Sequence, residues 1–462
     1  MKQGGVSMKI IGVDIGTTTL SFVVLNTDSG KLLECVNLSN PAVAAGGEAH
    51  VQDPEVIVSL IRDQIAQMKE RYAPIDAVGL DGQMHGMLYV DRFGRAVSPL
   101  YTWQDGHGQM DAGGETYAQR LTRLTGHSMS TGFGLTTHFV LSQRGKVPED
   151  AVKICTIADY AAMTLAALAE PVCHASNAAS MGLFDTARGA WDLAAVKRAG
   201  IAPDILPEIT RTCRIIGRDA DGVPVACAIG DNQASFMGSV SEPESSVLVN
   251  VGTGGQVSMM GCARETLHEC EMRPLEGGRM LLVGSSLCGG RAYATLHRFL
   301  LSCARLAGSD APSLYEQMNR EAMAALERTS LKVSTRLCGS RARPQERGSI
   351  TGIDDRNLTP GALCAGVLHG MTDELFAFYS EMLRAGAQPA QVMIVSGNGV
   401  RRNPALRKAL RMRFNLEMKA PAHLEEAAYG AALAAVLALG GDEAYARARR
   451  MMEYLDADCG GD

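Results

Sequence analysis

Two short hairpins carry the residue types that bind phosphate. The first runs from Val13 to Thr17 (VDIGT) and the second from Val249 to Thr253 (VNVGT). Each joins two apolar, β-rich runs through glycine, threonine and short polar residues, the pattern of a tight β-hairpin. Small side chains let the backbone approach an oxyanion, and successive N–H groups form a nest that binds it. Two such turns facing each other predict a clamp for a polyphosphate, and their repetition predicts a duplicated nucleotide-binding fold.

Two aspartates stand where phosphoryl chemistry needs a carboxylate. Asp14 ends an apolar strand, where an unpaired carboxylate is costly to bury. A Mg²⁺ ion that bridges the phosphates of ATP would offset that cost, whereas a turn-stabilising interaction with Thr17 or Thr18 is the structural alternative. Asp231 follows Gly230, which leaves the backbone there uncluttered. Asp231 is therefore a candidate general base for an attacking hydroxyl, and its alternative role is to cap a helix.

Two further polar clusters have the groups needed to recognise a sugar. Amide, imidazole and carboxylate groups hydrogen-bond to hydroxyls, while the face of a tryptophan covers the apolar C–H face of a sugar. The alternatives are that the tryptophan is a core anchor and the methionine a packing residue. The candidate substrate-binding residues are Gln83, Met84 and His85 after a glycine turn, and Trp103, Gln104 and Asp105 after a proline-marked loop.

The elements that must position these residues also repeat. In the first half a strand-like run at 77–80 enters a glycine turn, and in the second half a run at 392–395 does the same. Each half then has a helix whose first turn carries acids, as the helix dipole favours. The segment 238–246, with a proline and several serines, separates the halves. We therefore expect two α/β domains, 8–236 and 237–445, with a ligand cleft between them.

The composition is compatible with this organisation. At 462 residues, the chain is too long for one ordinary core. Its 46% hydrophobic and 20% charged residues are typical of a soluble globular protein, and a net charge of -6 gives no basic excess for nucleic acid. The twelve cysteines lack CxxC pairs, which argues against a disulfide framework or a zinc cluster. With no signal peptide and no apolar run long enough to span a membrane, we expect a cytoplasmic protein whose translation starts at Met1 or Met8.

Taken together, the short motifs resemble those of the FGGY carbohydrate kinases. Each motif is weak alone, but their order is that of the family, and they cover the chain from Lys9 to about Leu439. A longer run at 283–299, with QMHG and WQDG, is most similar to sedoheptulokinase-like ketose kinases, followed by xylulokinases. The motifs are GVDIGTTT at 12–19, QMHG at 83–86, WQDG at 103–106, GDNQ at 230–233, VGTGG at 251–255, and SGNG at 396–399 followed by AAYGAA at 427–432.

The resemblance implies a fold class and a set of roles. The fold would be α/β, with two duplicated ribonuclease-H-like (actin-type ATPase) domains and a central cleft where ATP and sugar meet. The N-terminal domain would hold the sugar and the first phosphate hairpin, and the C-terminal domain the nucleotide. Asp231 would accept the proton of the sugar hydroxyl, and Asp14 would be linked to Mg²⁺. The implied nucleotide contacts are Gly16, Thr17, Thr18, Gly252, Thr253, Gly254, Gly284, Gly397, Asn398 and Gly399.

These observations predict an ATP-dependent carbohydrate kinase, a phosphotransferase with an alcohol group as acceptor. A ketose such as sedoheptulose is the expected substrate, and a xylulokinase or a gluconokinase-like sugar kinase is the alternative. A non-enzymatic, ATP-switched sugar-sensing protein would share the hairpins, but the intact Asp231 and the full set of sugar-reading positions argue against it. We expect a small sugar as partner, neither nucleic acid nor membrane, and leave a homodimer open.

The chain departs from the family pattern at a few positions. Asp81 stands where the family tends to have serine, His107 where an arginine is common, and Asn398 where glycine is usual. The first two could tune substrate preference. Separately, the arginines between Arg336 and Arg347 predict a solvated basic loop, with phosphate binding as the alternative.

Overall fold

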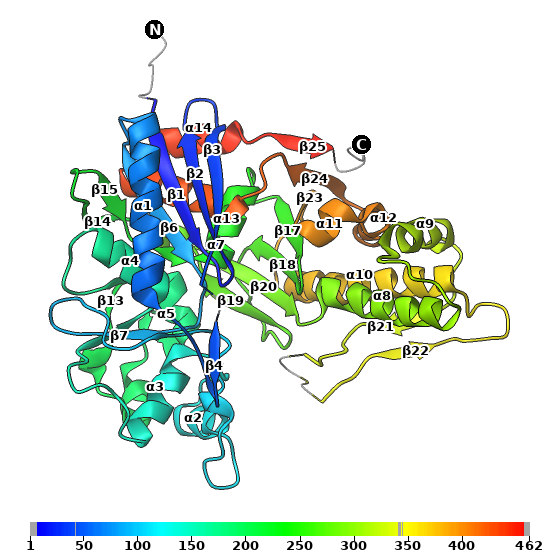
Figure 1. The fold of residues 1–462 in the computed structure, drawn as a ribbon, viewed down its shortest axis with the longest axis horizontal. Coiled ribbons are helices and arrows are strands. Elements are labelled where there is room, and N and C mark those ends of the chain that lie inside the picture. The colour runs from blue at the N-terminus through cyan, green and yellow to red at the C-terminus, as the bar shows by residue number, and fades with distance from the viewer. Residues whose placement is uncertain (1–6, 42, 341–342, 344, 457–462) are drawn as a thin grey trace. The chain divides into compact units, whose positions relative to one another are not determined.

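The computed structural model describes residues 7–41, 43–340, 343 and 345–456, and Figure 1 shows its ribbon. Contacts within the chain divide it into two compact units. The N-terminal unit contains the residues up to Ser241 together with 273–279 and 423–453. The C-terminal unit contains 242–272, 280–422 and the residues from Tyr454. Residues 273–279 and 423–445 of the predicted second domain thus pack in the N-terminal unit, together with 446–453 beyond its predicted end.

A seven-stranded mixed sheet forms the centre of the N-terminal unit. Its order is β14-β15-β6-β1-β2-β3, with β16 beside β6. β1 is antiparallel to β2, whereas β1 and β16 are both parallel to β6, so these three strands end at one edge. The strands are β1 (Lys9–Ile15), β2 (Thr19–Asn26), β3 (Leu32–Ser39), β6 (Ala77–Gly82), β14 (Ile215–Arg218), β15 (Pro224–Ala226) and β16 (Ile229–Gly230).

Two helices cover the two faces of this sheet (Figure 1). Side chains such as Val13 pack with the apolar stripe of α1 (Pro54–Tyr72). Because side chains alternate along a strand, Gly12 and Asp14 face the other side. There α13 (Glu426–Ala438) lies so close that a Cβ on Gly12 would collide with the Ala428 carbonyl oxygen. Only glycine permits this approach, and it explains why the segment 423–453 joins the N-terminal unit.

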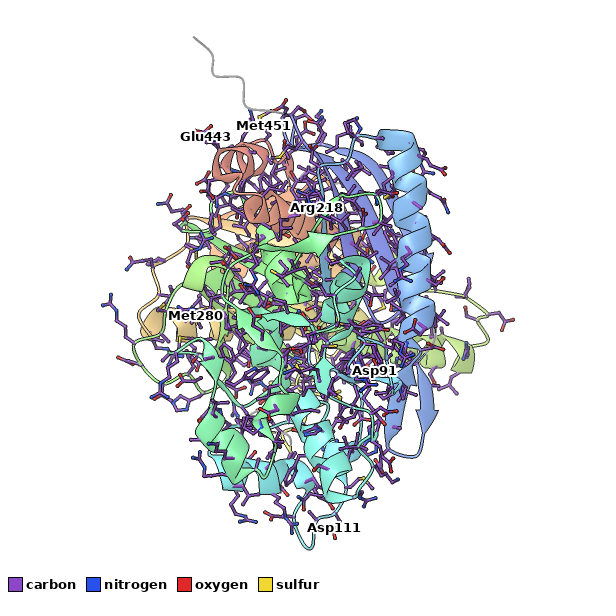
Figure 2. The ribbon with its side chains drawn as sticks, turned by 90° about the vertical axis from the view of Figure 1, so that its left-hand side faces the viewer. Asp91, Asp111, Arg218, Met280, Glu443 and Met451 are labelled. Atoms are coloured by element: carbon purple, nitrogen blue, oxygen red, sulfur yellow. The ribbon has the colours of Figure 1, made fainter. Side chains whose placement is uncertain are left out.

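The remaining N-terminal elements form a smaller subdomain and the flanks of the sheet. In Figure 2, Asp111 in this subdomain lies at the opposite end of the unit from Glu443 and Met451, in and just after α14. The helices are α2 (Tyr117–Thr125), α3 (Gly134–Gln143), α4 (Ile157–Leu165), α5 (Ala175–Met181), α6 (Leu193–Arg198), α7 (Asp231–Ser239), α14 (Asp442–Arg450), and the 3₁₀ turns η1 (His107–Gln109), η2 (Pro203–Ile205) and η3 (Glu276–Gly278). The short strands are β4 (Ala44–Gly46), β5 (Ala49–Gln52), β7 (Leu88–Val90), β8 (Leu100–Tyr101), β9 (Lys153–Cys155), β10 (Val172–His174), β11 (Phe184–Asp185), β12 (Ala190–Trp191) and β13 (Glu208–Thr210).

The C-terminal unit repeats the central topology. Its sheet has the order β19-β20-β18-β17-β23-β24-β25. β17 is antiparallel to β18 and parallel to β23, as β1 is to β2 and β6. This repetition confirms the predicted duplication of an actin-type α/β domain. The strands are β17 (Ser246–Val251), β18 (Gly255–Met260), β19 (Cys270–Pro274), β20 (Met280–Ser286), β23 (Val392–Ser396), β24 (Glu417–Pro421) and β25 (Tyr454–Asp456), with β21 (Lys332–Ser334) and β22 (Ser349–Thr351) as a separate ribbon.

One long helix organises the core of the C-terminal unit. α10 (Pro360–Arg384) contributes Leu375 and Phe378 to a cluster that includes Val257 of β18. Its N-terminus is fixed by Thr359, whose hydroxyl accepts from the Ala362 N–H, and by a proline at the first helical position. The other helices of the unit are α8 (Gly289–Leu306), α9 (Tyr315–Ala325), α11 (Asn398–Arg402) and α12 (Pro404–Phe414).

The structure also bears on three expectations from composition. Within the described part of the chain, no helix is both long and apolar enough to cross a membrane, and every cysteine there is a free thiol. The prediction of a solvated basic loop is wrong for Arg336, which pairs with Glu269 at 3.1 Å and with Glu346 at 2.8 Å. Glu269 lies far from this loop in the sequence, so local spacing could not reveal the pairing. Arg341 lies outside the described residues.

Candidate functional site

Three carboxylates gather at one edge of the N-terminal sheet. Asp14 is directly opposite Asp81 in the register of β1 and β6, and Asp231 follows β16, which is also parallel to β6. Because parallel strands carry their carboxyl ends to one edge, these three residues are neighbours. The sequence singled out Asp14 and Asp231 as site residues, whereas Asp81 was noted only as a departure from the family.

The surroundings of these carboxylates raise their pKa values. Burial, and then the charge of Asp231, raises the pKa of Asp14 to about 7. Burial raises the pKa of Asp231 to about 6, although the Asn232 N–H and Arg273 act in the opposite direction. The pKa of Asp81 is raised well above its usual range, by burial and then by Asp14. Groups that titrate near neutral pH are typical of sites that transfer protons or bind cations.

The structural alternatives for the two predicted acids are not observed. The N-cap of α7 is Gly230, and Asp231 is the first residue of the helix, with no side-chain cap bond at that end. The Asp14 Oδ1 is buried without a hydrogen-bond partner, so Thr17 and Thr18 do not satisfy it. Behind Asp231, the Ser176 hydroxyl accepts from the Gly230 N–H at 2.9 Å and fixes the start of the turn.

The first hairpin turn is held rigidly through its carbonyl groups. The Gly16 carbonyl accepts from Asn40 Nδ2 at 2.6 Å, and that of Thr17 accepts from Gln52 Nε2 at 2.9 Å. The carbonyl of Thr18 accepts from the Asn40 N–H. With its acceptors occupied in this way, the turn keeps one orientation, as a preformed anion site requires.

Trp103 and Gln83 meet at the hydroxyl of Thr17. Trp103 Nε1 donates to Thr17 Oγ1 at 2.9 Å, and this hydroxyl donates to Gln83 Oε1 at 3.4 Å. Trp103 is 47% exposed, so the core-anchor alternative does not hold for it. Its indole is fixed at the polar end and open on the rest of its surface. This arrangement suits the apolar face of a sugar.

His85 and Met84 are held in unusual positions between β6 and β7. His85 has a φ of 75°, which is rare for a residue other than glycine. Its Nδ1 donates to the Ser180 carbonyl at 2.8 Å, and its ring stacks on Phe133 at 4.8 Å. Met84 is buried, and its sulfur lies so close to Gly230 that a Cβ there would be 2.8 Å away. His85 is thus oriented for a polar contact, while Met84 packs under the Asp231 turn.

Asp105 and Gln104 differ sharply in exposure. Asp105 is fully buried, and its Oδ1 accepts from the Thr137 hydroxyl and from His107 Nδ1, each at 2.9 Å. Gln104 is exposed beside it. Asp105 therefore orients His107, whose ring stands edge-on to Tyr101. The sequence had noted His107 only as a replacement for an arginine.

The C-terminal unit contains a pocket of about 840 Å³ at its hairpin turn. Gly252 and Thr253 line it on one side, and Gly397, Asn398 and Gly399 on another. Three arginines, Arg291, Arg298 and Arg402, also lie on its wall. Cationic groups beside glycine turns suit a polyphosphate.

A glycine after β23 is essential to the shape of this pocket. Gly397 has a φ of 87°, and a Cβ there would lie 2.6 Å from the Val251 carbonyl oxygen. The second hairpin turn is also tied to the start of α8, because the Gly290 N–H donates to the Gly252 carbonyl and the Arg291 N–H to the Thr253 carbonyl, each at 3.0 Å. The pocket wall is therefore a rigid backbone surface.

Five of the ten predicted nucleotide contacts do not line the pocket: Gly16, Thr17 and Thr18 belong to the N-terminal unit, and Gly254 and Gly284 lie elsewhere in the C-terminal unit. Gly254 lies at the base of the turn, where a Cβ would be 2.9 Å from the Ser286 carbonyl oxygen. Gly284 lies within β20, and its missing side chain makes room for Phe378 of α10. Both glycines permit close packing of the elements behind the pocket.

Sequence reasoning missed most of the remaining wall. Tyr293 and Tyr315 stack on each other at 6.3 Å, and the Tyr293 hydroxyl donates to Asn319 at 3.1 Å. These residues come from α8 and α9, whose helical spacing alone gave no functional signal. Asn403 both lines the pocket and caps α12, accepting from the Leu406 N–H at 3.0 Å. The wall residues that the sequence analysis did not name are Gly290, Arg291, Tyr293, Ala294, Arg298, Tyr315, Asn319, Met371, Arg402, Asn403 and Leu406.

Known proteins match nearly the whole chain. Mouse (Mus musculus) sedoheptulokinase is 27% identical over 92% of this chain and 96% of its own length. Xylulose kinase of Streptomyces coelicolor is 25% identical over 96% of this chain and 90% of its own length. Among solved structures, gluconate kinase from Lactobacillus acidophilus superimposes with a TM-score of 0.81 at 20% identity, covering 97% of this chain and 93% of that protein.

The family assignment rests on two domain matches. Residues 9–238 match the N-terminal domain, and residues 248–439 match the C-terminal domain, of the FGGY family of carbohydrate kinases. Together they account for most of the chain, including every candidate residue named above. The chain belongs to the FGGY family of carbohydrate kinases, and it is an ATP-using sugar kinase.

Proposed function

We propose that this kinase transfers the γ-phosphoryl group of ATP to a primary hydroxyl of a ketose such as sedoheptulose, with Asp231 as the general base. In this proposal the N-terminal unit holds the sugar, through Gln83, His85, Trp103 and Gln104. The C-terminal unit holds ATP in the pocket at Gly252 and Gly397. The observation that carries the proposal is the position of Asp231 among buried carboxylates, with a pKa of about 6.

Asp231 has the properties that a base for this reaction requires. Phosphoryl transfer needs the acceptor oxygen in line with the phosphate, a nearby base and neutralised phosphate charge. A carboxylate with a pKa near 6 is ionised at neutral pH, yet it takes a proton more readily than an ordinary aspartate. Ser176 fixes the turn that carries it. Asp231 therefore accepts the hydroxyl proton as the oxygen attacks.

A divalent cation fits the residues at the acidic edge. The buried Oδ1 of Asp14 and both oxygens of Asp81 have no hydrogen-bond donor within the described structure, and Mg²⁺ prefers such oxygen ligands. Asp14 would hold the ion. When bound, Mg²⁺ would neutralise part of the charge of the phosphates.

The substrate class is supported by the relatives, which include sedoheptulokinases, xylulose kinases and a gluconokinase. The test is ADP release from Mg-ATP with sedoheptulose, D-xylulose, D-ribulose, gluconate and glycerol offered separately. We expect sedoheptulose to give the highest kcat/KM. If xylulose or gluconate gave the highest kcat/KM, that sugar would take the place of sedoheptulose as the proposed substrate. ATP binding without any sugar-stimulated turnover would contradict the kinase reaction.

The raised pKa of Asp231 predicts an acid limb in the pH profile. The base acts only when ionised, so kcat/KM should fall about tenfold per pH unit below pH 6 and level off above it. An aspartate with an ordinary pKa near 3.9 would keep full activity at pH 5. The measurement is kcat/KM for the sugar between pH 4.5 and 8, with thermal unfolding followed at each pH to exclude acid denaturation.

Removing the indole of Trp103 should weaken sugar binding. In Trp103→Ala we expect the sugar KM to rise about tenfold, or about 1.4 kcal/mol, because an exposed aromatic platform is lost. The KM for ATP should stay within about twofold. The matched control is Trp103→Phe, which keeps a ring but loses the Nε1 bond to Thr17. A sugar KM that is unchanged in Trp103→Ala would remove Trp103 from the sugar site.

A further inference from the structure

Asp81 is a fully buried carboxyl group whose side-chain neighbour is a second carboxyl group, that of Asp14. It is 0% exposed, and neither of its oxygens has a hydrogen-bond donor within the described structure. An uncompensated carboxylate in such a position costs several kcal/mol. Other buried acids in the same unit are satisfied: Asp159, for example, accepts from the Thr156 hydroxyl at 2.8 Å and from Asn177 Nδ2 at 2.9 Å. Asp81 therefore lacks a compensating group that comparable residues have.

The β-sheet register puts Asp81 against a second carboxylate. Asp14 and Asp81 are direct partners on adjacent parallel strands, and Gly12 and Gly79 are paired in the same way two residues earlier. Neighbouring strands lie about 4.8 Å apart, so the two side chains project side by side from the same face. The Asp14 Oδ1 is also buried and unpartnered. No other residue donates to these three oxygens, and the hydrogen bond between Asp14 and Asp81 requires one of the two carboxyl groups to hold a proton.

The charges around the pair are of one sign. Asp231 and Glu425 both act on Asp14 and raise its pKa, and Asp231 also acts on Asp81. Arg273 lowers the pKa of Asp231, and its Nη1 donates to Asn232 at 3.1 Å. The pair therefore faces carboxylates. Asp14 is only half-buried, so it is the side of the pair that solvent reaches.

We propose that Asp81 is a second carboxylate ligand beside Asp14, and that the two bind a divalent cation of the Mg²⁺ or Mn²⁺ class even when no nucleotide is present. This inference rests on the proposed function, in which Asp14 holds the cation. The donor set consists only of carboxylate oxygens, which favours hard cations over zinc. Two adjacent carboxylates carry two negative charges when ionised and can hold a divalent cation without the phosphates of ATP, so the cation site would be preloaded before ATP arrives.

The test is a titration of the nucleotide-free, sugar-free full chain with Mn²⁺, following free Mn²⁺ by electron paramagnetic resonance. We expect one site in the wild type and at least a tenfold weaker Kd in Asp81→Asn. Asp159→Asn is the matched control, because it removes an equally buried carboxylate whose partners are elsewhere, and it should keep the wild-type Kd. The inference is overturned if the wild type binds no Mn²⁺ without nucleotide, or if Asp81→Asn binds it equally well.

Thermal unfolding is a second measurement, in which Asp81→Asn should have opposite effects on stability without metal and with Mn²⁺. Without metal, Asp81→Asn should unfold at a higher temperature than the wild type, since a buried carboxyl that must hold a proton or an unpaired charge beside Asp14 is replaced by a neutral amide that can donate to Asp14. With Mn²⁺ the wild type should gain stability by mass action, and the variant should not. Asp81→Ser repeats the measurement if the asparagine does not fold. If the variant is not stabilised and the wild type binds no Mn²⁺, a proton shared by Asp14 and Asp81 satisfies the pair, and the cation site is overturned.

The two proposals fail separately. If Mn²⁺ binding depends on Asp81 but no sugar stimulates ADP release, the proposed function fails alone. If a sugar stimulates turnover but the Mn²⁺ Kd is the same in the wild type and in Asp81→Asn, the kinase proposal stands and Asp81 is rejected as a metal ligand.

Discussion

Asp231→Asn should lower kcat for the sugar by about 10²- to 10⁴-fold, the range that a general base contributes. The substitution keeps the size of the side chain and removes its negative charge together with its ability to take a proton. The Kd for ATP should be unchanged, because the pocket proposed to hold the nucleotide is formed by the C-terminal unit. The measurement pairs sugar-dependent ADP release with ATP binding by calorimetry.

The control for this variant is a capping carboxylate. Asp192 caps α6 by accepting from the Ala195 N–H at 2.9 Å, and asparagine caps as well as aspartate. Asp192→Asn should therefore keep wild-type kcat. If Asp231→Asn also retained kcat within about threefold, Asp231 would be only the first residue of α7, and a different group would have to accept the proton.

Local sequence patterns predicted the elements that carry the site. The hairpins near Gly16 and Gly252 could be predicted because glycine and threonine between β-rich runs specify a tight turn within a few residues. Repetition of hairpin, strand and acid-led helix predicted the duplicated fold, since each half must bury the same kind of sheet.

The remaining features depend on contacts between distant segments. The pairing of Asp14 with Asp81 follows from the register of β1 and β6, which lie far apart in the chain. The close approach of α13 to Gly12 likewise moves the segment 423–453 into the N-terminal unit. The motif around Asp105 predicted that it binds the sugar. Its burial against Thr137 and His107 depends on the tertiary structure and could not be predicted from the motif.

Gly397→Ala should disrupt the proposed nucleotide pocket more effectively than any single side-chain removal. Alanine at a φ of 87° costs about 1–3 kcal/mol, and its Cβ would also be 2.6 Å from the Val251 carbonyl oxygen. The carbonyl cannot move freely, because Val251 pairs with Gly255 in the hairpin of β17 and β18. The turn that carries Asn398 and Gly399 must therefore shift, and we expect the Kd for ATP to rise at least 30-fold.

The unusual backbone angle and the steric clash can be separated with a matched glycine. Gly308 in the same unit has a φ of 79°, but nothing lies within 4 Å of the position its Cβ would occupy. Gly308→Ala should therefore lose a similar 1–3 kcal/mol of stability and bind ATP as the wild type does. ATP affinity by calorimetry and the midpoint of thermal unfolding together decide the outcome.

If both variants bound ATP normally, the pocket would tolerate a shifted turn and the wall at Gly397 would not contact the nucleotide. If both lost binding equally, general destabilisation of the C-terminal unit would account for the loss. Only a selective loss in Gly397→Ala assigns the effect to the approach of this turn to the hairpin at Val251, and so places the nucleotide against it.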